Sequence, residues 1–182
     1  MAVNGKNKGN SQERKLANLL SKRFESVTGL AQGFRRNPDS GSFFGASNQK
    51  RKETHDTTHA HFGDLICPDN FKFSVESKFY KAGPTFAAIV KGKIAQWDIW
   101  MAQAKQDAVN SKKDVMLIIK YNGIDELVFV EKQVTGITLI ITYNNMYGYK
   151  LDDYLQLNNN HFFIMGATQS STNNQTLPAA QG

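Results

Sequence analysis

The stretch FKFSVESKFY at residues 71–80 alternates between two kinds of side chain. Alternation with a period of two is typical of a β-strand, whose successive side chains point to opposite faces. The two predicted faces are Phe71, Phe73, Val75, Ser77 and Phe79 on one side, and Lys72, Ser74, Glu76, Lys78 and Tyr80 on the other. Glu76 and Lys78 are therefore expected to be neighbours on one face of a sheet.

The run FGDLIC at residues 62–67 precedes this strand and is separated from it by Pro68-Asp69-Asn70. Proline, aspartate and asparagine are the residues that tight turns favour. We expect a β-hairpin here. Such a hairpin would place Asp64 close to Glu76.

A helix is predicted over residues 11–27, where Leu16, Leu20 and Phe24 recur at helical spacing. Asn10 or Ser11 is the expected N-cap. Glu13 lies three residues before Leu16 and so falls on the inward face, where a carboxylate needs a reason to be.

Further elements follow the break at Gly83-Pro84. Residues 86–109 suit one helix with Ile94, Trp97, Met101, Ala104 and Ala108 on its buried stripe. The runs at 114–121 and 126–132 are two predicted strands joined at Asn122-Gly123, a strong turn signal, and 136–145 is a candidate strand. The order predicts an α/β fold with a central mixed sheet flanked by helices.

Length and composition indicate one domain over residues 1–165, with a basic N-terminal arm at 1–10 and a long loop at 37–62. The Ser/Thr/Asn/Gln-rich segment 166–182 is a predicted disordered tail. The single cysteine, Cys67, allows no internal disulfide and suits a core position in a cytoplasmic protein. No apolar run is long enough for a membrane span, so no membrane partner is expected.

The net charge of +6 is unevenly distributed. Residues 1–52 contain 11 Lys/Arg against 3 Asp/Glu, which gives +8, whereas the remaining residues sum to −2. A basic region of this kind favours binding to nucleic acid, although a solvated basic surface would have the same composition.

An aspartate before one strand, with Glu-x-Lys on the next, can place two carboxylates and an ammonium around one point. Asp64, Glu76 and Lys78 have this spacing. Carboxylate oxygens are the ligands that Mg²⁺ and Mn²⁺ prefer, and the metal would polarise a phosphate and activate water. Lys78 would orient that water or stabilise developing charge. An isolated Glu-x-Lys is more often a surface ion pair.

This pattern, GDL at 63–65 followed by ESK at 76–78, resembles the PD-(D/E)xK nuclease superfamily. Over roughly residues 8–131 the chain also resembles the archaeal and phage-like Holliday-junction resolvases of that superfamily. The resemblance implies a restriction-endonuclease-like core and a Mg²⁺-dependent, or Mn²⁺-dependent, homodimeric endodeoxyribonuclease. It also implies a place in DNA recombination or repair, and the small size suits a bacteriophage protein in a bacterial host.

The resemblance further implies roles for individual residues. The metal ligands would be Asp64, Glu76 and the backbone carbonyl of Ser77, with the helix glutamate Glu13 as a further candidate. Ser40 matches a serine near the site, although Ser42 is an alternative alignment because the segment between Gly41 and Gly63 is longer than in the archaeal enzymes. Gln103 matches a polar helix residue near the site, and an ordinary solvent-facing position is its alternative.

Basic residues in the loop and arm are candidates for contact with DNA phosphates. They are Lys8, Arg35, Arg36, Lys50, Arg51, Lys52 and Lys81, with Lys6 as an addition to the arm. His55, His59 and His61 could contribute to a zinc site, but solvent exposure or phosphate contact is favoured because no cysteine accompanies them. Phe43 and Phe44 are candidates for insertion at a junction or for anchoring the loop. For Trp97 and Trp100, packing is favoured over base stacking.

The preferred function is cleavage of branched DNA, because no recognisable sequence-reading module accompanies the nuclease pattern. Two-fold symmetry of a homodimer would match a four-way junction. A general, repair or restriction-type nuclease is the alternative within the superfamily. A non-catalytic DNA-binding protein is the alternative of another class, in which Glu13 would form a buried salt bridge with Lys78.

Overall fold

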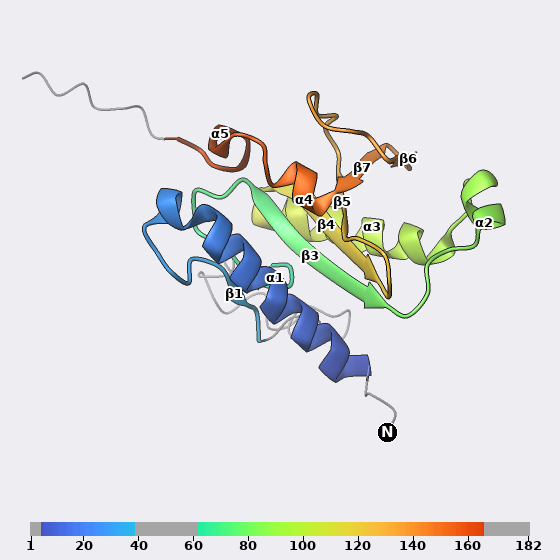
Figure 1. Ribbon diagram of the computed structural model, residues 1–182, viewed down its shortest axis with the longest axis horizontal. Helices are drawn as coiled ribbons and strands as arrows, with labels where there is room; N and C mark the ends of the chain where they lie inside the picture. Colours follow the sequence, from blue (N-terminus) through green and yellow to red (C-terminus); the bar gives the residue numbers. More distant parts are fainter. Residues whose placement is uncertain (1–4, 39–61, 166–182) are drawn as a thin grey trace, which may run out of the picture.

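A five-stranded mixed sheet forms the centre of the computed structural model, which describes residues 5–38 and 62–165 (Figure 1). Its strand order is β3-β4-β5-β7-β6, with β3 and β4 parallel and the other neighbours antiparallel. Its strands are β3 (Phe73–Tyr80), β4 (Asp114–Tyr121), β5 (Leu127–Val130), β6 (Ile141–Tyr143) and β7 (Met146–Lys150). The expected α/β class is confirmed, with helices flanking a mixed sheet as in a restriction-endonuclease-like core.

The alternating pattern of β3 is confirmed at Phe73 and Val75, which enter a hydrophobic core on one face, and at Glu76, which bonds to Gln103 from the opposite face. Phe73 and Val75 pack with Leu20 and Phe24 of helix α1 (Gly5–Thr28). On the opposite face the core belongs to helix α3 (Ala95–Ser111), and it contains the predicted buried stripe of that helix. The sheet is thus covered on both sides, and β3 lies at its edge.

The predicted helix over 86–109 is wrong as a single element. It is divided into α2 (Phe86–Val90) and α3, and Gly92 between them has a φ of 60°. A left-handed residue of this kind ends a helix, and glycine adopts it without steric cost. The two helices together make the crossover between the parallel strands β3 and β4, as a parallel pair requires.

The predicted hairpin of residues 62–80 is also wrong. Strand β2 (Leu65–Ile66) pairs with β1 (Arg35–Arg36) in a separate two-stranded antiparallel sheet. The turn itself is present, since the Phe71 N–H donates to the Pro68 carbonyl at 3.0 Å. Strand β2 has only two residues, so few backbone hydrogen bonds select its partner strand. Burial of Leu65 in the core under α1 then decides that β2 pairs with β1.

Helix α1 begins at Gly5, so the N-cap predicted at Asn10 or Ser11 is wrong. Residues 5–10 of the expected basic arm are helical. Glu13 is buried on this helix, as its spacing predicted. None of the helices in the described ranges 5–38 and 62–165 is both long and apolar enough to span a membrane.

The C-terminal part of the sheet is a hairpin of β6 and β7 that the sequence patterns did not separate. Asn144 and Asn145 connect the strands with φ values of 47° and 58°. Two consecutive left-handed residues make a type I′ turn, which asparagine tolerates. The strand expected over 136–145 is confirmed only at 141–143. Short helices α4 (Leu151–Tyr154) and α5 (Asn159–Phe162) then close the core under α1.

Gly148 in β7 provides a test of this packing. A Cβ at this position would lie 2.7 Å from Ile141 Cγ2 and 2.8 Å from Phe129 Cε1. We expect Gly148→Ala to lower the free energy of unfolding by about 1–3 kcal/mol through overpacking. Gly83→Ala is the control, because its Cβ would lie 3.4 Å from the nearest atom, on the Tyr121 ring. Equal urea midpoints for the two variants would contradict the described packing.

Candidate active site

Gly63 and Asp64 lie against the free edge of β3. The Asp64 N–H donates to the Val75 carbonyl at 2.8 Å. Gly63 has a φ of 81°, and a Cβ there would lie 2.7 Å from the same carbonyl oxygen. Only glycine fits so close an approach without displacing the backbone. The position of Asp64 therefore depends on a glycine at position 63, since any side chain there would meet the Val75 carbonyl.

The carboxylate of Asp64 is held by the backbone of β3. The Ser77 N–H donates to Asp64 Oδ2 at 2.8 Å. In an extended strand the N–H and C=O of one residue point the same way, so the Ser77 carbonyl also faces the edge where Asp64 lies. The aspartate carboxylate and this carbonyl thus share one side of the strand.

Asn37 forms two hydrogen bonds to the backbone of Gly63 and Asp64. Its buried backbone N–H donates to the Asp64 carbonyl at 2.9 Å, and its Nδ2 donates to the Gly63 carbonyl at 3.0 Å. Asn37 directly follows β1, so the short β1–β2 sheet carries the chain to this contact. Sequence reasoning gave Asn37 no role, because the two carbonyls come within its reach only in the folded chain.

Glu76, Lys78 and Gln103 form a closed hydrogen-bonded group. Lys78 Nζ donates to Glu76 Oε1 at 2.5 Å and to Gln103 Oε1 at 3.1 Å, while Gln103 Nε2 donates to Glu76 Oε1 at 2.8 Å. Glu76 is 2% exposed, which makes it almost inaccessible to solvent. The pairing of Glu76 with Lys78 follows from strand alternation, and Gln103 reaches it from α3.

The electrostatics of this group are unusual. Burial and the neighbouring Asp64 raise the pKa of Glu76 to about 8, although the Lys78 ammonium opposes the shift. Burial likewise raises the pKa of Asp64 to about 6, against the lowering effect of Lys78. The Lys78 pKa is raised, because burial lowers it less than Glu76 and Asp64 raise it. Burial therefore disfavours the charged form of both acids more strongly than Lys78 favours it.

These residues fit a divalent cation. Two buried carboxylates whose pKa values are raised would both be stabilised in the charged form by a nearby cation. Within residues 5–38 and 62–165 no three Asp, Glu, His or Cys side chains form a ready metal cluster. Mg²⁺, however, is commonly held by one or two carboxylates and completes its octahedron with water. Asp64, Glu76 and the Ser77 carbonyl match that requirement.

Glu13 pairs with Arg36 rather than with Lys78, so the salt bridge considered for a pure binder is not present. Arg36 Nε donates to Glu13 Oε2 at 2.6 Å, and its second amino group donates to Asn10 Oδ1 at 2.9 Å. Glu13 still adds a negative charge that raises the Asp64 pKa, after the larger effect of burial. Arg36, expected to contact DNA, thus also fixes Glu13 beside the site.

The remaining predicted residues divide by location. Arg35 and Lys81 are exposed, as residues that contact DNA must be. Trp97 and Trp100 are buried in the core under α3, so their predicted packing role is confirmed. Cys67 is partly buried against the α1 core. Outside the described residues or side chains lie Lys6, Lys8, Ser40, Ser42, Phe43, Phe44, Lys50, Arg51, Lys52, His55, His59 and His61.

Asp107 is a second residue that sequence reasoning missed. It lies one helical turn after Gln103 on α3, and its charge raises the pKa of both Asp64 and Glu76, after larger effects of burial. Residues four apart share a helix face. The i+4 spacing from Gln103 was the signal that could have identified it.

The raised pKa of Glu76 predicts how stability depends on pH without metal. An acid with a higher pKa in the folded state stabilises the fold below its unfolded pKa and loses this contribution as pH rises to the folded value. We expect wild-type protein in EDTA to lose about 1 kcal/mol or more between pH 4.5 and 8. Glu76→Gln should reduce that loss in urea unfolding. An identical pH dependence in both proteins would contradict the shift.

Asn37 offers a test of how Asp64 is positioned. Asn37→Ala leaves the Gly63 carbonyl without its amide donor, so we expect a loss of about 1–3 kcal/mol in unfolding free energy. The Ser77 amide should also exchange faster with solvent, because its acceptor Asp64 is less well fixed. Asn160→Ala, at an exposed position, is the matched control. Unchanged Ser77 exchange would show that Asn37 does not hold the segment.

The chain also matches a known protein family. A family model described as "Phage putative PDDEXK endonuclease" matches residues 4–174. Searches of the curated proteins and of the solved structures returned no significant match.

Proposed function

Because the chain belongs to the family of phage PDDEXK endonucleases, we propose that it hydrolyses DNA phosphodiester bonds with Mg²⁺ and that four-way junctions are its substrate. The observation that carries the metal-dependent chemistry is the buried pair Asp64 and Glu76 on adjoining segments, whose pKa values are both raised in spite of the neighbouring Lys78. Residues 1–165 form the single nuclease domain in this proposal. Mn²⁺ is the alternative cation.

Asp64, Glu76 and the Ser77 carbonyl are the proposed ligands. When bound, the cation supplies Lewis-acid polarisation of the scissile phosphate and makes hydroxide accessible near neutral pH. The Asp64 carboxylate is already oriented, because the Ser77 N–H donates to its Oδ2. Its Oδ1 would then be available to the cation. Glu76 is oriented in the same way by Gln103 and Lys78.

Lys78 is the proposed charge-stabilising group. Its pKa is raised, so its ammonium stays protonated at neutral pH and can donate to the attacking water or to a phosphate oxygen. Gln103 accepts from Lys78 and donates to Glu76, which fixes the distance between the two. Gln103 is therefore a proposed positioning residue.

Glu13 extends the acidic site from the side of α1. One of its carboxylate oxygens accepts from Arg36, and the other would be available to help hold the cation. Ser40 is proposed to act near the same point by resemblance alone. Arg35 precedes Asp64 in the sequence, Lys81 follows Lys78, and both are exposed. We propose that they contact DNA phosphates. The other proposed phosphate contacts are Lys8, Arg36, Lys50, Arg51 and Lys52.

The choice of a branched substrate rests on the resemblance to resolvases and on the uneven charge of the chain. A basic region without a sequence-reading module favours recognition of DNA shape and backbone. A homodimer would present two such sites to the two strands that must be cut. A phage-encoded enzyme would act in the host cytoplasm. A general PDDEXK nuclease acting on linear DNA is equally consistent with the family.

Cleavage of an end-labelled immobile junction tests the proposal. We expect paired symmetric nicks with Mg²⁺, none in EDTA, and at least a 100-fold slower rate for Glu76→Ala, since one ligand and about 3 kcal/mol of transition-state stabilisation are lost. Glu25→Ala, an exposed glutamate on α1, is the control and should cut normally.

Linear duplex and single-stranded DNA complete the experiment. Equal cutting of all three substrates would replace the resolvase by a general nuclease. Tight junction binding without any metal-dependent cleavage would overturn the enzyme and favour the non-catalytic binder.

A further inference from the structure

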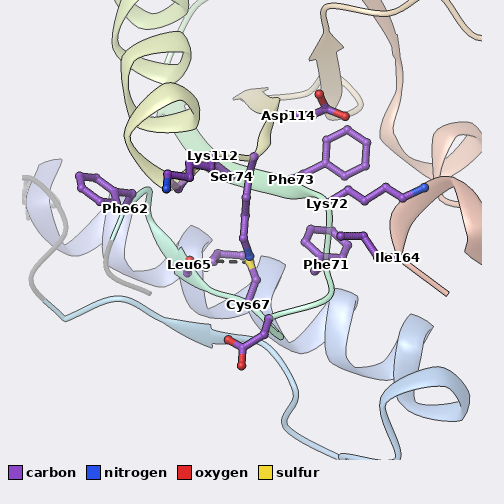
Figure 2. Close-up of a pocket in the computed structure, with 13 residues that line it drawn as sticks. Phe62, Leu65, Cys67, Phe71, Lys72, Phe73, Ser74, Lys112, Asp114 and Ile164 are labelled. Carbon is purple, nitrogen blue, oxygen red and sulfur yellow. Dashed lines mark hydrogen bonds between the residues drawn. The ribbon is translucent and has the colours of Figure 1, made fainter. Parts of the chain in front are cut away.

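A cavity of about 600 Å³ is lined by the start of β3, the segment before it and the residues that follow α3 (Figure 2). Its wall includes Phe62 and Ser74, which are each two residues from a site carboxylate, Asp64 and Glu76 respectively. A strand rises about 3.3 Å per residue, so Ser74 and Glu76 are about 7 Å apart on the same face of β3. The cavity and the active site are therefore adjacent.

One face of helix α3 extends from the active site to the cavity. Gln103, Asp107 and Ser111 succeed one another at four-residue intervals, and such residues share a helix face. Gln103 bonds to Glu76 at the active site, whereas Ser111 lines the cavity. A DNA strand bound along this face would pass from the active site to the cavity.

The cavity combines an apolar wall with cations. Half-buried Phe62 and exposed Ile164 contribute the accessible part of the apolar wall, whereas Leu65, Phe71 and Phe73 are buried (Figure 2). Three lysines also line the cavity; they are Lys72, Lys112 and Lys113.

The charge of the cavity favours an anion. Two aspartates, Asp69 and Asp114, line the cavity. Asp114 forms an ion pair at 2.9 Å with Lys132, which is not part of the lining. Lys112 and Lys113 directly follow α3, where their charge offsets the negative end of the helix dipole. Lys112 is exposed and available to a ligand.

We propose that this cavity is a nucleotide-binding subsite, which receives a nucleotide of the bound DNA strand beside the cut. The inference rests on the proposed function. The apolar wall suits a base, and the exposed Lys112 suits its phosphate, whereas Lys72 and Lys113 already donate to the carbonyls of Asn160 and Pro68. The volume lies in the range of about 300–1,000 Å³ that is usual for small-molecule sites. A separation of about 7 Å corresponds to about two nucleotides of rise along one strand.

Binding of an immobile four-way junction in EDTA tests the role of the lysines. Lys112→Gln should weaken binding several-fold and lower the slope of log K against log salt by about 1, because one phosphate contact is lost. Lys91→Gln is the matched control, since Lys91 is also exposed but lies beyond the other end of α3. Equal affinities and slopes for the two variants would overturn the proposal.

Labelling of Cys67 tests occupancy of the cavity itself. Cys67 is the single cysteine of the chain and lines this cavity. Burial raises its thiol pKa to about 12, so its reaction with N-ethylmaleimide at pH 8 should be slow enough to follow by mass spectrometry. Saturating junction DNA should slow the reaction at least threefold, whereas the same concentration of inorganic phosphate should not.

The outcomes separate this proposal from the function on which it rests. Junction binding and cleavage with unprotected Cys67 would overturn the subsite and leave the nuclease intact, even if Lys112→Gln weakened binding. Failure of the wild-type protein to bind any DNA would instead overturn the proposed function. Protection of Cys67 together with the Lys112 effect would support the subsite.

Discussion

The hydrogen bond from the Ser77 N–H to the Asp64 carboxylate is the contact on which the candidate site depends. It exists because β3 lies at the edge of the sheet, so that Ser77 has an amide free to bond outside the ladder. Gly63 allows the close approach, and the Asp64 N–H to Val75 carbonyl bond completes it. An exposed edge that would otherwise invite unwanted pairing is thereby used to orient a carboxylate.

The site also brings together groups from both sides of the sheet. Glu76 faces α3, where Gln103 holds it, while Glu13 comes from α1 on the other side. Edge strand β3 is the place where both helices can reach one point. A carboxylate in the middle of the sheet would be enclosed by a neighbouring strand and could not meet groups from two layers.

Placing these acids together has an energetic cost. Glu76 and Asp64 are both buried, and their pKa values are raised in spite of the adjacent Lys78. Charged groups are expensive to remove from water unless they are paired. The arrangement thus lowers the stability of the folded chain, which is common where a binding site is preformed.

Local regularities of the sequence determined much of this protein. Alternation in 71–80 placed Glu76 and Lys78 on one face, and helical spacing placed Glu13 inward. Asn122-Gly123 marked the turn between β4 and β5, which Gly123 makes with a φ of 71°. These predictions succeeded because strand and helix periods are properties of neighbouring residues.

Which segments meet depends on the packing of the whole chain. That packing paired β2 with β1 instead of β3, joined Arg36 to Glu13, and brought Asn37 and Asp107 to the site. Partner choice for a two-residue strand, or for a single side chain, depends on burial against residues distant in the chain. No local pattern contains that information, because the free energy that selects the partner arises only when the whole core has formed.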